Sequence, residues 1–427
     1  MTLFLSSCAL AFFLIVGLPV ALSLFISAGI GLILLGGVDL LVGIFATGPA
    51  ASLTSYELLT IPMFLLMAEF MTVSGISMTL FSAFAAWTGR MRGGLGVATA
   101  LTGAAFGAIS GSSAAAAATL SSSSIPSMLR HGYERKFASG IVSISGTLAM
   151  LIPPSIVIIF YGLLSGVDVG KLLIGGIIPG LLVTLTIILT IWYLIWRDPS
   201  IAPSGTRSTL KEKIMSLKVA GPFLLLFMMV TGFIYLGIAT PVESSALGAL
   251  GAFVMTLASR KMNRKMFYLA LRNTCMTSAM IGMVIVCAQV FGTFLTMTRA
   301  TQELVELVGA SGLSPFTVLM IVVLIYLVLG CFLDQLSILI LTVPIILPLM
   351  VGLGYDPLWF GILAILLAEI GMVTPPVGLN VFVVSRVTGI PAEEVFSGVL
   401  PHVIAHLLAV GLMIAFPGII TWLPSKM

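Results

Sequence analysis

Side chains that carry oxygen cluster at four places inside otherwise apolar segments, and their types suit a small, hard cation. They are Ser110, Ser112, Ser113, Ser145, Thr147 and Ser155 in the first half of the chain, and Asp334, Gln335, Ser337, Glu369, Thr374 and Asn380 in the second. Hydroxyl, amide and carbonyl oxygens are the ligands that hard metal ions prefer. Because the first half places no carboxylate at its two clusters, Na⁺ is favoured over a relay of protons.

Two of the four clusters surround consecutive prolines, Pro153-Pro154 and Pro375-Pro376. Proline lacks the N–H of the helical hydrogen bond and clashes with the carbonyl four residues before it, but it is well tolerated as the first residue of a helix. We therefore predict two broken helices, over residues 138–165 and 358–386. Their half-helix ends would offer unpaired carbonyls to a cation and unpaired N–H groups to an anion.

The two proline pairs lie 222 residues apart, and this spacing extends along the chain. It pairs five of the seven prolines between Pro19 and Pro179 with another proline. At an average proline usage of about 5%, chance would pair well under one. The same spacing aligns Ser112 with Asp334 and Ser113 with Gln335. The sequence therefore predicts a duplicated unit.

The composition is that of an integral membrane protein. Of the 427 residues, 59% are hydrophobic and 8% are charged, and the mean hydropathy is +1.22, whereas an ordinary soluble domain is roughly 25% charged. Apolar runs of about 20 residues, long enough to span the hydrocarbon, recur along the chain. The basic residues cluster in loops, so the net charge of +4 reflects membrane topology and indicates no binding of nucleic acid.

Basic residues also orient the segments, because they favour the cytoplasmic side. Segment 93–129 is rich in Ser, Ala and Gly and has basic residues at both ends. We predict that it is a re-entrant hairpin with a cytoplasmic base and a tip buried in protein or facing water. The matching hairpin, 314–350, has no Lys or Arg in its flanks. A loop expected over residues 38–56 also lacks them and is placed outside.

Together these features predict an all-α membrane protein made of two inverted-topology repeats. It would contain about ten transmembrane helices, two re-entrant hairpins and two broken helices. The first repeat covers residues 1–196, a cytoplasmic linker covers 197–218, and the second repeat covers 219–427, with both chain termini outside. Inverted repeats with discontinuous helices near the bilayer midplane are the architecture of secondary transporters.

Four charged residues in or near apolar runs are functional candidates. Asp334 stands between Phe332-Leu333 and a run of Leu and Ile, and a carboxylate is costly in a membrane, so a functional role is the default hypothesis. Glu69 and Glu243 are further intramembrane or near-interface carboxylates, and Glu243 is placed to cap a helix start. Arg299 could bind a substrate carboxylate or anchor an interfacial helix by snorkelling.

Structural roles compete with these functional ones. Small residues such as Ser and Ala line the contacts between membrane helices, and Ser121 to Ser124 are predicted to serve packing. His402 and His406 have no carboxylate between them and are predicted to be structural. The serine-rich tip has no GxSxG motif and no nearby histidine, which argues against a hydrolase. The chain is not expected to be an enzyme.

The motifs GAISGSSAAA, RHGYERKFASGI, LIPPSIVIIFYG and VTPPVGLNVFV resemble the large membrane subunit of tripartite ATP-independent periplasmic (TRAP) transporters, over essentially the whole chain. The resemblance implies Na⁺-driven uptake of an organic acid across the bacterial inner membrane by an elevator movement of a transport domain against a scaffold. It also implies two partners, a small four-helix membrane subunit and a soluble periplasmic protein that delivers the substrate. Within the family the sialic-acid branch is favoured and the C4-dicarboxylate branch is next.

The resemblance also implies where the ligands bind. Two or more transported Na⁺ ions would be held at the two tips and the two breaks, by Ser110, Ser113, Gly146, Thr147, Pro153, Gly330, Asp334, Gln335 and Thr374. Substrate would lie between the tips, with Ser112, Ser155, Arg299 and Asn380 as candidate contacts. Alternatives are a stand-alone Na⁺-coupled anion carrier of the same superfamily and, less favoured, a channel.

Overall fold

The computed structural model describes residues 1–204, 209–260 and 262–427, and the regular elements in these ranges are helices. The first half contains α1 (Thr2–Val16), α2 (Val20–Leu53), η1 (Tyr56–Leu59), α3 (Thr60–Ser74), α4 (Ile76–Thr88), α5 (Gly94–Ser110), α6 (Ser113–Arg130), α7 (Arg135–Leu151), α8 (Ile156–Ser165), α9 (Val169–Gly175) and α10 (Ile177–Arg197). The second half contains α11 (Leu210–Tyr235), α12 (Pro241–Ala258), α13 (Arg264–Met297), α14 (Ala300–Ala310), α15 (Pro315–Phe332), α16 (Gln335–Gly352), α17 (Pro357–Gly371), α18 (Leu379–Thr388), α19 (Ala392–Ala415), α20 (Gly418–Thr421) and η2 (Pro424–Lys426). The predicted all-α class is confirmed.

Eight of the described helical segments are long and apolar enough to cross a bilayer, and the count reaches ten when each bent pair is taken as one span. One bent pair is α7 with α8, whose axes differ by 43°. Both values agree with the predicted number of about ten.

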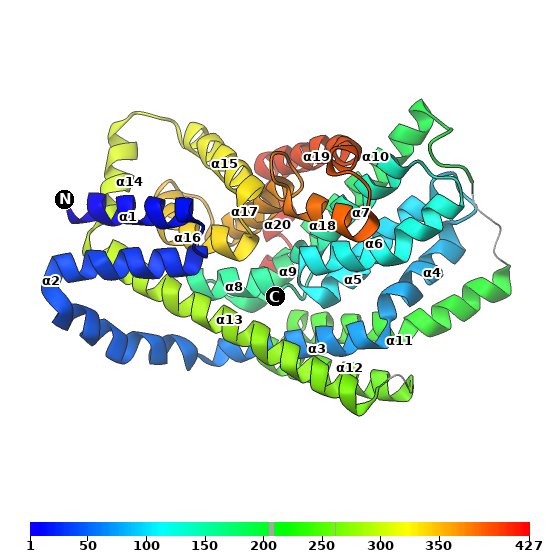
Figure 1. The fold of residues 1–427 in the computed structure, drawn as a ribbon, viewed down its shortest axis with the longest axis horizontal. Coiled ribbons are helices and arrows are strands. Elements are labelled where there is room, and N and C mark those ends of the chain that lie inside the picture. Colours follow the sequence, from blue (N-terminus) through cyan, green and yellow to red (C-terminus); the bar gives the residue numbers. More distant parts are fainter. Residues whose placement is uncertain (205–208, 261) are drawn as a thin grey trace.

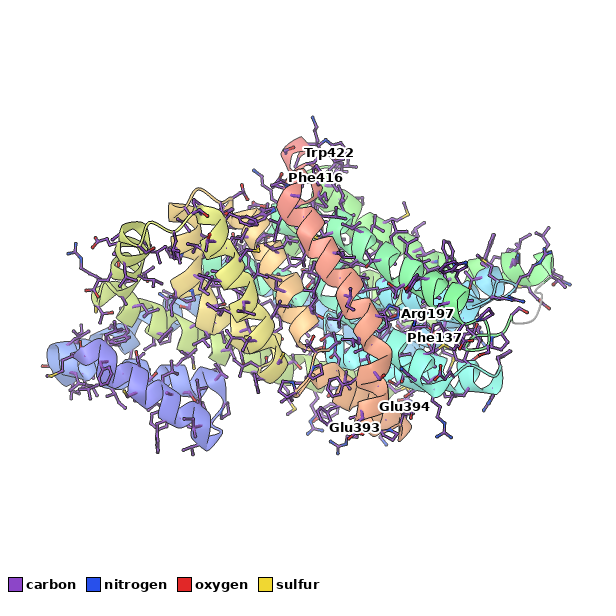
Figure 2. All side chains as sticks on the ribbon, turned by 90° about the horizontal axis from the view of Figure 1, so that it is seen from above. Phe137, Arg197, Glu393, Glu394, Phe416 and Trp422 are labelled. Carbon is purple, nitrogen blue, oxygen red and sulfur yellow. The ribbon has the colours of Figure 1, made fainter. Side chains whose placement is uncertain are left out.

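Helix α19 has one exposed apolar side and one buried side. It runs across the molecule from Glu393 and Glu394 at one end toward Phe416 and Trp422 at the other (Figure 2). The apolar side chains exposed along it recur every four residues, at Leu400, Ile404, Leu408 and Leu412, and so form one stripe. His402 and His406 are buried on the protein side, where His406 Nδ1 lies 3.5 Å from Thr186 Oγ1 of α10.

The helix boundaries follow the spacing seen in the sequence. Adding 222 to the bounds of α6, 113 and 130, gives 335 and 352, which are the bounds of α16. The same addition carries α5 onto α15, α7 onto α17 and α8 onto α18 to within two residues. Helices α4 and α14 also correspond, and each joins an outer helix, α3 or α13, to a hairpin.

The two hairpins turn through short tips built from capping residues. Helix α5 ends at Ser110 because Gly111 has φ 56°, and α6 begins where the Ser112 side chain accepts a hydrogen bond from Ala115 N. In the second hairpin Asp334 takes the same position and accepts from Ser337 N. A residue whose side chain accepts such a bond satisfies one of the free N–H groups of a helix start. Figure 1 shows the two hairpins approaching the centre from opposite ends of the long axis.

The two predicted breaks separate α7 from α8 and α17 from α18. The chain leaves helical geometry at Ile152, and Ser155 then caps α8 by accepting from Ile158 N. Each hairpin packs on a broken helix through glycine. A Cβ on Gly330 of α15 would lie 2.7 Å from Ala368 O and 2.8 Å from Gly371 Cα of α17. Such close backbone contact joins each hairpin firmly to its broken helix.

Two boundaries differ from the sequence prediction. The loop expected over 38–56 is wrong, because α2 consists of two helical stretches that meet at the non-helical Gly36 and Gly37, and the second stretch continues to Leu53. Helix α11 begins at Leu210, within the segment predicted as a linker, where Thr209 and Glu212 form a capping box. Residues 205–208 of that segment lie outside the described residues.

Candidate functional site

The two hairpin tips share one cavity of about 400 Å³ near the centre of the molecule. Residues 110–115 of the first tip and 334–336 of the second line it. Both breaks reach it as well, because Met150 and Ile156 flank the first and Met372 and Leu379 flank the second. The remaining lining comes mainly from α3 and α13. The structure thus brings together four segments that the sequence singled out separately.

Four helix starts meet at this cavity. Lining residues include the first residues of α6, α16 and α18 and the Ile156-Val157 start of α8. The first N–H groups of a helix have no partner inside it, and each start carries roughly half a positive charge. The backbone therefore gives the cavity an attraction for anions that no single side chain reveals.

Polar side chains of the tips differ in how they are satisfied. Ser113 is fully buried, and its Oγ has no hydrogen-bond partner among the described residues. Gln335 is also buried; its Nε2 donates to Ile365 O at 3.0 Å, but its Oε1 is unpartnered there. Ser110 Oγ makes a long contact of 3.4 Å with Ser112 O. A buried oxygen without a donor is costly unless something outside the chain satisfies it.

Several other predicted residues stand outside the cavity lining. Thr147 and Thr374 donate to carbonyls of their own helices, Ile144 O and Ile370 O. The other residues behind the lining are Gly146, Pro153, Ser155, Gly330 and Asn380. Of these, Ser155 donates to Met150 O, whereas both side-chain polar atoms of the fully buried Asn380 are unpartnered within the described part of the chain. The predicted substrate contacts Ser155 and Asn380 therefore do not line this cavity.

Arg299 also lies away from the cavity. It occupies the junction between α13 and α14 with φ 55°, and its side chain is exposed. The interfacial helix predicted after it is present as α14. Arg299, predicted as a substrate contact, therefore does not line the cavity between the tips, because it lies exposed at the turn into α14.

Glu69 was singled out in the sequence as an intramembrane carboxylate, but sequence reasoning did not place it with the tips. It lines the cavity from α3, opposite the tips, and Asn273 Nδ2 of α13 donates to its Oε2 at 3.1 Å. Thr72 and Thr277, one turn further along the same helices, also line this wall. The sequence shows only that Glu69 is a carboxylate within an apolar span. It does not show that Glu69 lies with the tips, because α3, α13 and the two hairpins are far apart in the sequence.

Glu369 of α17 lies deeper than the cavity lining. It is 1% exposed, and neither carboxylate oxygen has a hydrogen-bond partner among the described residues. It stands one turn beyond Ile365, whose carbonyl holds Gln335. An unpaired charge in such a place would cost several kcal/mol, so this carboxyl either carries a proton or neighbours a cation.

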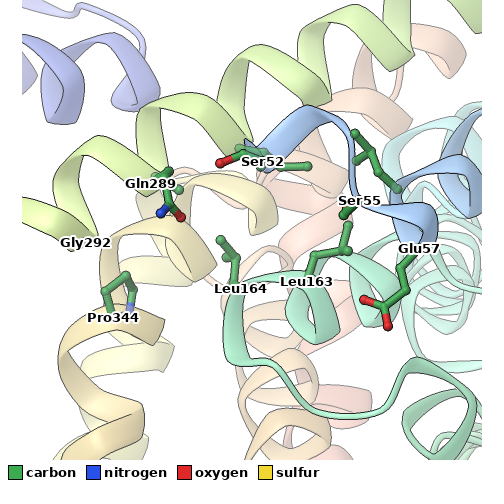
Figure 3. A pocket seen from close by; sticks show the side chains of 11 residues that line it. Ser52, Ser55, Glu57, Leu163, Leu164, Gln289, Gly292 and Pro344 are labelled. Carbon is green, nitrogen blue, oxygen red and sulfur yellow. The ribbon is translucent and has the colours of Figure 1, made fainter. Parts of the chain in front are cut away.

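A second cavity of about 260 Å³ follows along the same helices (Figure 3). Residues 285–292 of α13 and Leu163 and Leu164 of α8 line it, whereas residues 277–281 of α13 and the start of α8 line the first cavity. The end of α2 and η1 complete its wall with Ser52, Ser55 and Glu57. Helices α8 and α13 thus border both cavities.

Comparison with known proteins adds the family. The family model described as "Tripartite ATP-independent periplasmic transporter, DctM component" matches residues 7–419. The chain belongs to this family. The TRAP family resemblance read from the motifs is thereby confirmed at the level of the large permease subunit.

Relatives within the TRAP family are named for several substrates. The chain is 37% identical to the C4-dicarboxylate TRAP transporter large permease protein DctM of Pseudomonas aeruginosa, over 87% of this chain and 86% of that protein. It is 31% identical to the sialic acid TRAP transporter large permease protein SiaM of Vibrio cholerae, over 96% of each. The preference for the sialic-acid branch therefore gains no support from similarity.

A solved structure shows a similar fold at low sequence identity. The YdaH transporter of Alcanivorax borkumensis matches with a TM-score of 0.66 and 16% identity, over 89% of this chain and 90% of that one. With its family and fold established, the chain is a multi-pass membrane transporter subunit, and transport rather than enzymatic catalysis is its activity.

Proposed function

We propose that the chain is the membrane permease of a Na⁺-coupled transporter that imports an organic acid across the bacterial inner membrane. The observation that carries this proposal is the single cavity shared by both hairpin tips and both breaks. Such a place offers cation ligands and anion-attracting helix starts side by side, as coupled transport requires.

The side-chain oxygens at the two hairpin tips are suitable ligands for Na⁺. The unpartnered Ser113 Oγ and Gln335 Oε1 are neutral, and Asp334 adds one carboxylate at the second tip. Hydroxyl and amide oxygens of this kind suit a hard alkali ion. Two or more such ions would travel with the substrate, held by the tips and by the carbonyls near the breaks.

An elevator movement suits the packing. Each hairpin is joined to its broken helix by glycine contacts, so the pair would move as one block, while α3 packs on both α12 and α13. Helices α4 and α14 connect the two groups. We propose that the hairpin block is the transport domain and that the outer helices form the scaffold.

The transporter would work with two partners. The isethionate TRAP transporter permease protein DctMQ of Oleidesulfovibrio alaskensis matches 95% of this chain, which covers 64% of that protein. Its name and extra length support a small membrane subunit beside this chain. A periplasmic protein would deliver the organic acid, and both termini of this chain would lie in the periplasm.

Reconstitution tests the proposal. The chain and the products of adjacent genes for a small membrane subunit and a periplasmic protein would be placed in proteoliposomes, with labelled organic acids that bind the periplasmic protein. Uptake should require both an inward Na⁺ gradient and the periplasmic protein. The proposal is refuted if uptake is equally fast without the Na⁺ gradient, or equally fast without the periplasmic protein.

A further inference from the structure

We infer that the cavity between the tips selects an organic acid with one carboxylate and a nitrogen-bearing donor group, and rejects dicarboxylates, with Glu69 as the residue that sets this preference. The inference rests on the proposed function and narrows its substrate class. It follows from the charges that surround the cavity.

The cavity contains carboxylates but no cationic side chain. Glu69 and Asp334 line it, and the described lining includes no Lys, Arg or His. A dicarboxylate would bring two more negative charges into this space. Na⁺ bound at the tips would balance Asp334 but leave Glu69 facing the substrate, and like charges that lie close together in a protein cavity repel each other.

The helix starts can hold a substrate carboxylate near the first tip. The starts of α6, α8, α16 and α18 reach the cavity, and each contributes roughly half a positive charge. Asp334 offsets the charge at the start of α16, which leaves the starts of α6, α8 and α18. The buried Ser113 Oγ, unpartnered in the described structure, lies at the α6 start, where it can donate its hydrogen to a substrate carboxylate while its lone pairs face Na⁺.

The wall of the cavity formed by α3 and α13 can accept a hydrogen bond from the substrate. Asn273 engages only Oε2 of Glu69 among the described residues, so Oε1 remains able to accept from a ligand. An ammonium, amidinium or amide N–H of the substrate would satisfy it, and charge-assisted hydrogen bonds of this kind are the stronger ones. A second substrate carboxylate at this wall would face Glu69 with no donor between them.

Matched pairs of small acids test the inference on the purified full chain in saturating NaCl. Succinate is compared with β-alanine and glutarate with 4-aminobutyrate, because each pair exchanges one carboxylate for an ammonium. Apparent dissociation constants come from the ligand dependence of thermal unfolding. The aminocarboxylate of each pair should bind about ten- to a hundredfold more tightly, the range of one charge-assisted contact.

Variants assign the preference to Glu69. Glu69→Gln keeps an oxygen to accept from Asn273 and should abolish the difference within each pair. Glu57→Gln, at an exposed carboxylate outside this cavity, should preserve it. The inference fails if the dicarboxylates bind as tightly as the aminocarboxylates, or if Glu69→Gln leaves the ranking unchanged.

The ranking measured on the unaltered chain decides the substrate class without any variant. If the inference about substrate class is wrong, Na⁺-dependent uptake in proteoliposomes should still be observed. Failure of the proposed function would instead appear as uptake that ignores the Na⁺ gradient, so the two outcomes are distinguishable.

Discussion

Replacing Asp334 with asparagine separates its two roles, as a helix cap and as a charge. Its side chain accepts from Ser337 N at 3.4 Å and from Ser337 Oγ at the start of α16. Asn caps helices about as well as Asp, whereas Ala costs about 1 kcal/mol. Asp334→Asn should therefore unfold at nearly the same temperature as the unaltered chain, and Asp334→Ala should be less stable.

The charge should matter for Na⁺ and not for folding. A contact to a charged group contributes about 1.5–3 kcal/mol, so losing it should raise the Na⁺ concentration for half-maximal uptake about 10- to 150-fold. The assay is uptake into proteoliposomes across a Na⁺ titration. Ser337→Ala keeps the carboxylate and should stay close to the unaltered chain. An unchanged Na⁺ requirement in Asp334→Asn would refute the assignment of this carboxylate to the ion site.

Three further substitutions test other parts of the structure. Ser113→Ala removes a buried hydroxyl that has no partner within the described structure. The midpoint of thermal unfolding should therefore not fall, whereas the Na⁺ concentration for half-maximal uptake should rise about tenfold. A loss of stability with an unchanged Na⁺ requirement would contradict this. Gly330→Ala should lower the free energy of unfolding by about 1–3 kcal/mol, because its Cβ would meet the α17 backbone, whereas Gly411→Ala, with nothing within 4 Å, serves as the control in the same denaturation assay. Arg299→Ala should leave the substrate concentration for half-maximal uptake unchanged, since Arg299 is exposed and outside the cavity; a large increase would restore it as a substrate contact.

Sequence reasoning succeeded where structure depends on local chemistry. Proline pairs break helices wherever they stand, and Ser112 and Asp334 cap the next helix through their own side chains. The 222-residue spacing then placed both tips and both breaks in matching positions. For these reasons the hairpins and broken helices could be located to within a few residues.

The failures have equally specific causes. Residues 38–53 are apolar and form a second helical stretch, because Gly36 and Gly37 turn the chain directly from one helix into the next without a loop. Glu69 faces the tips only because α3 and α13 pack side by side, a contact between residues 204 positions apart. Arg299 is carried outward by a left-handed residue conformation that no sequence motif announces. Each of these depends on geometry over a longer range than a motif covers.

Helix α8 has only ten residues, yet it forms part of the wall of both cavities. The two chambers therefore share a partition that belongs to the first broken helix. A displacement of α8 along α13 would change the volumes of both cavities together, so a ligand that fixes the position of α8 in one cavity would also fix the width of the other.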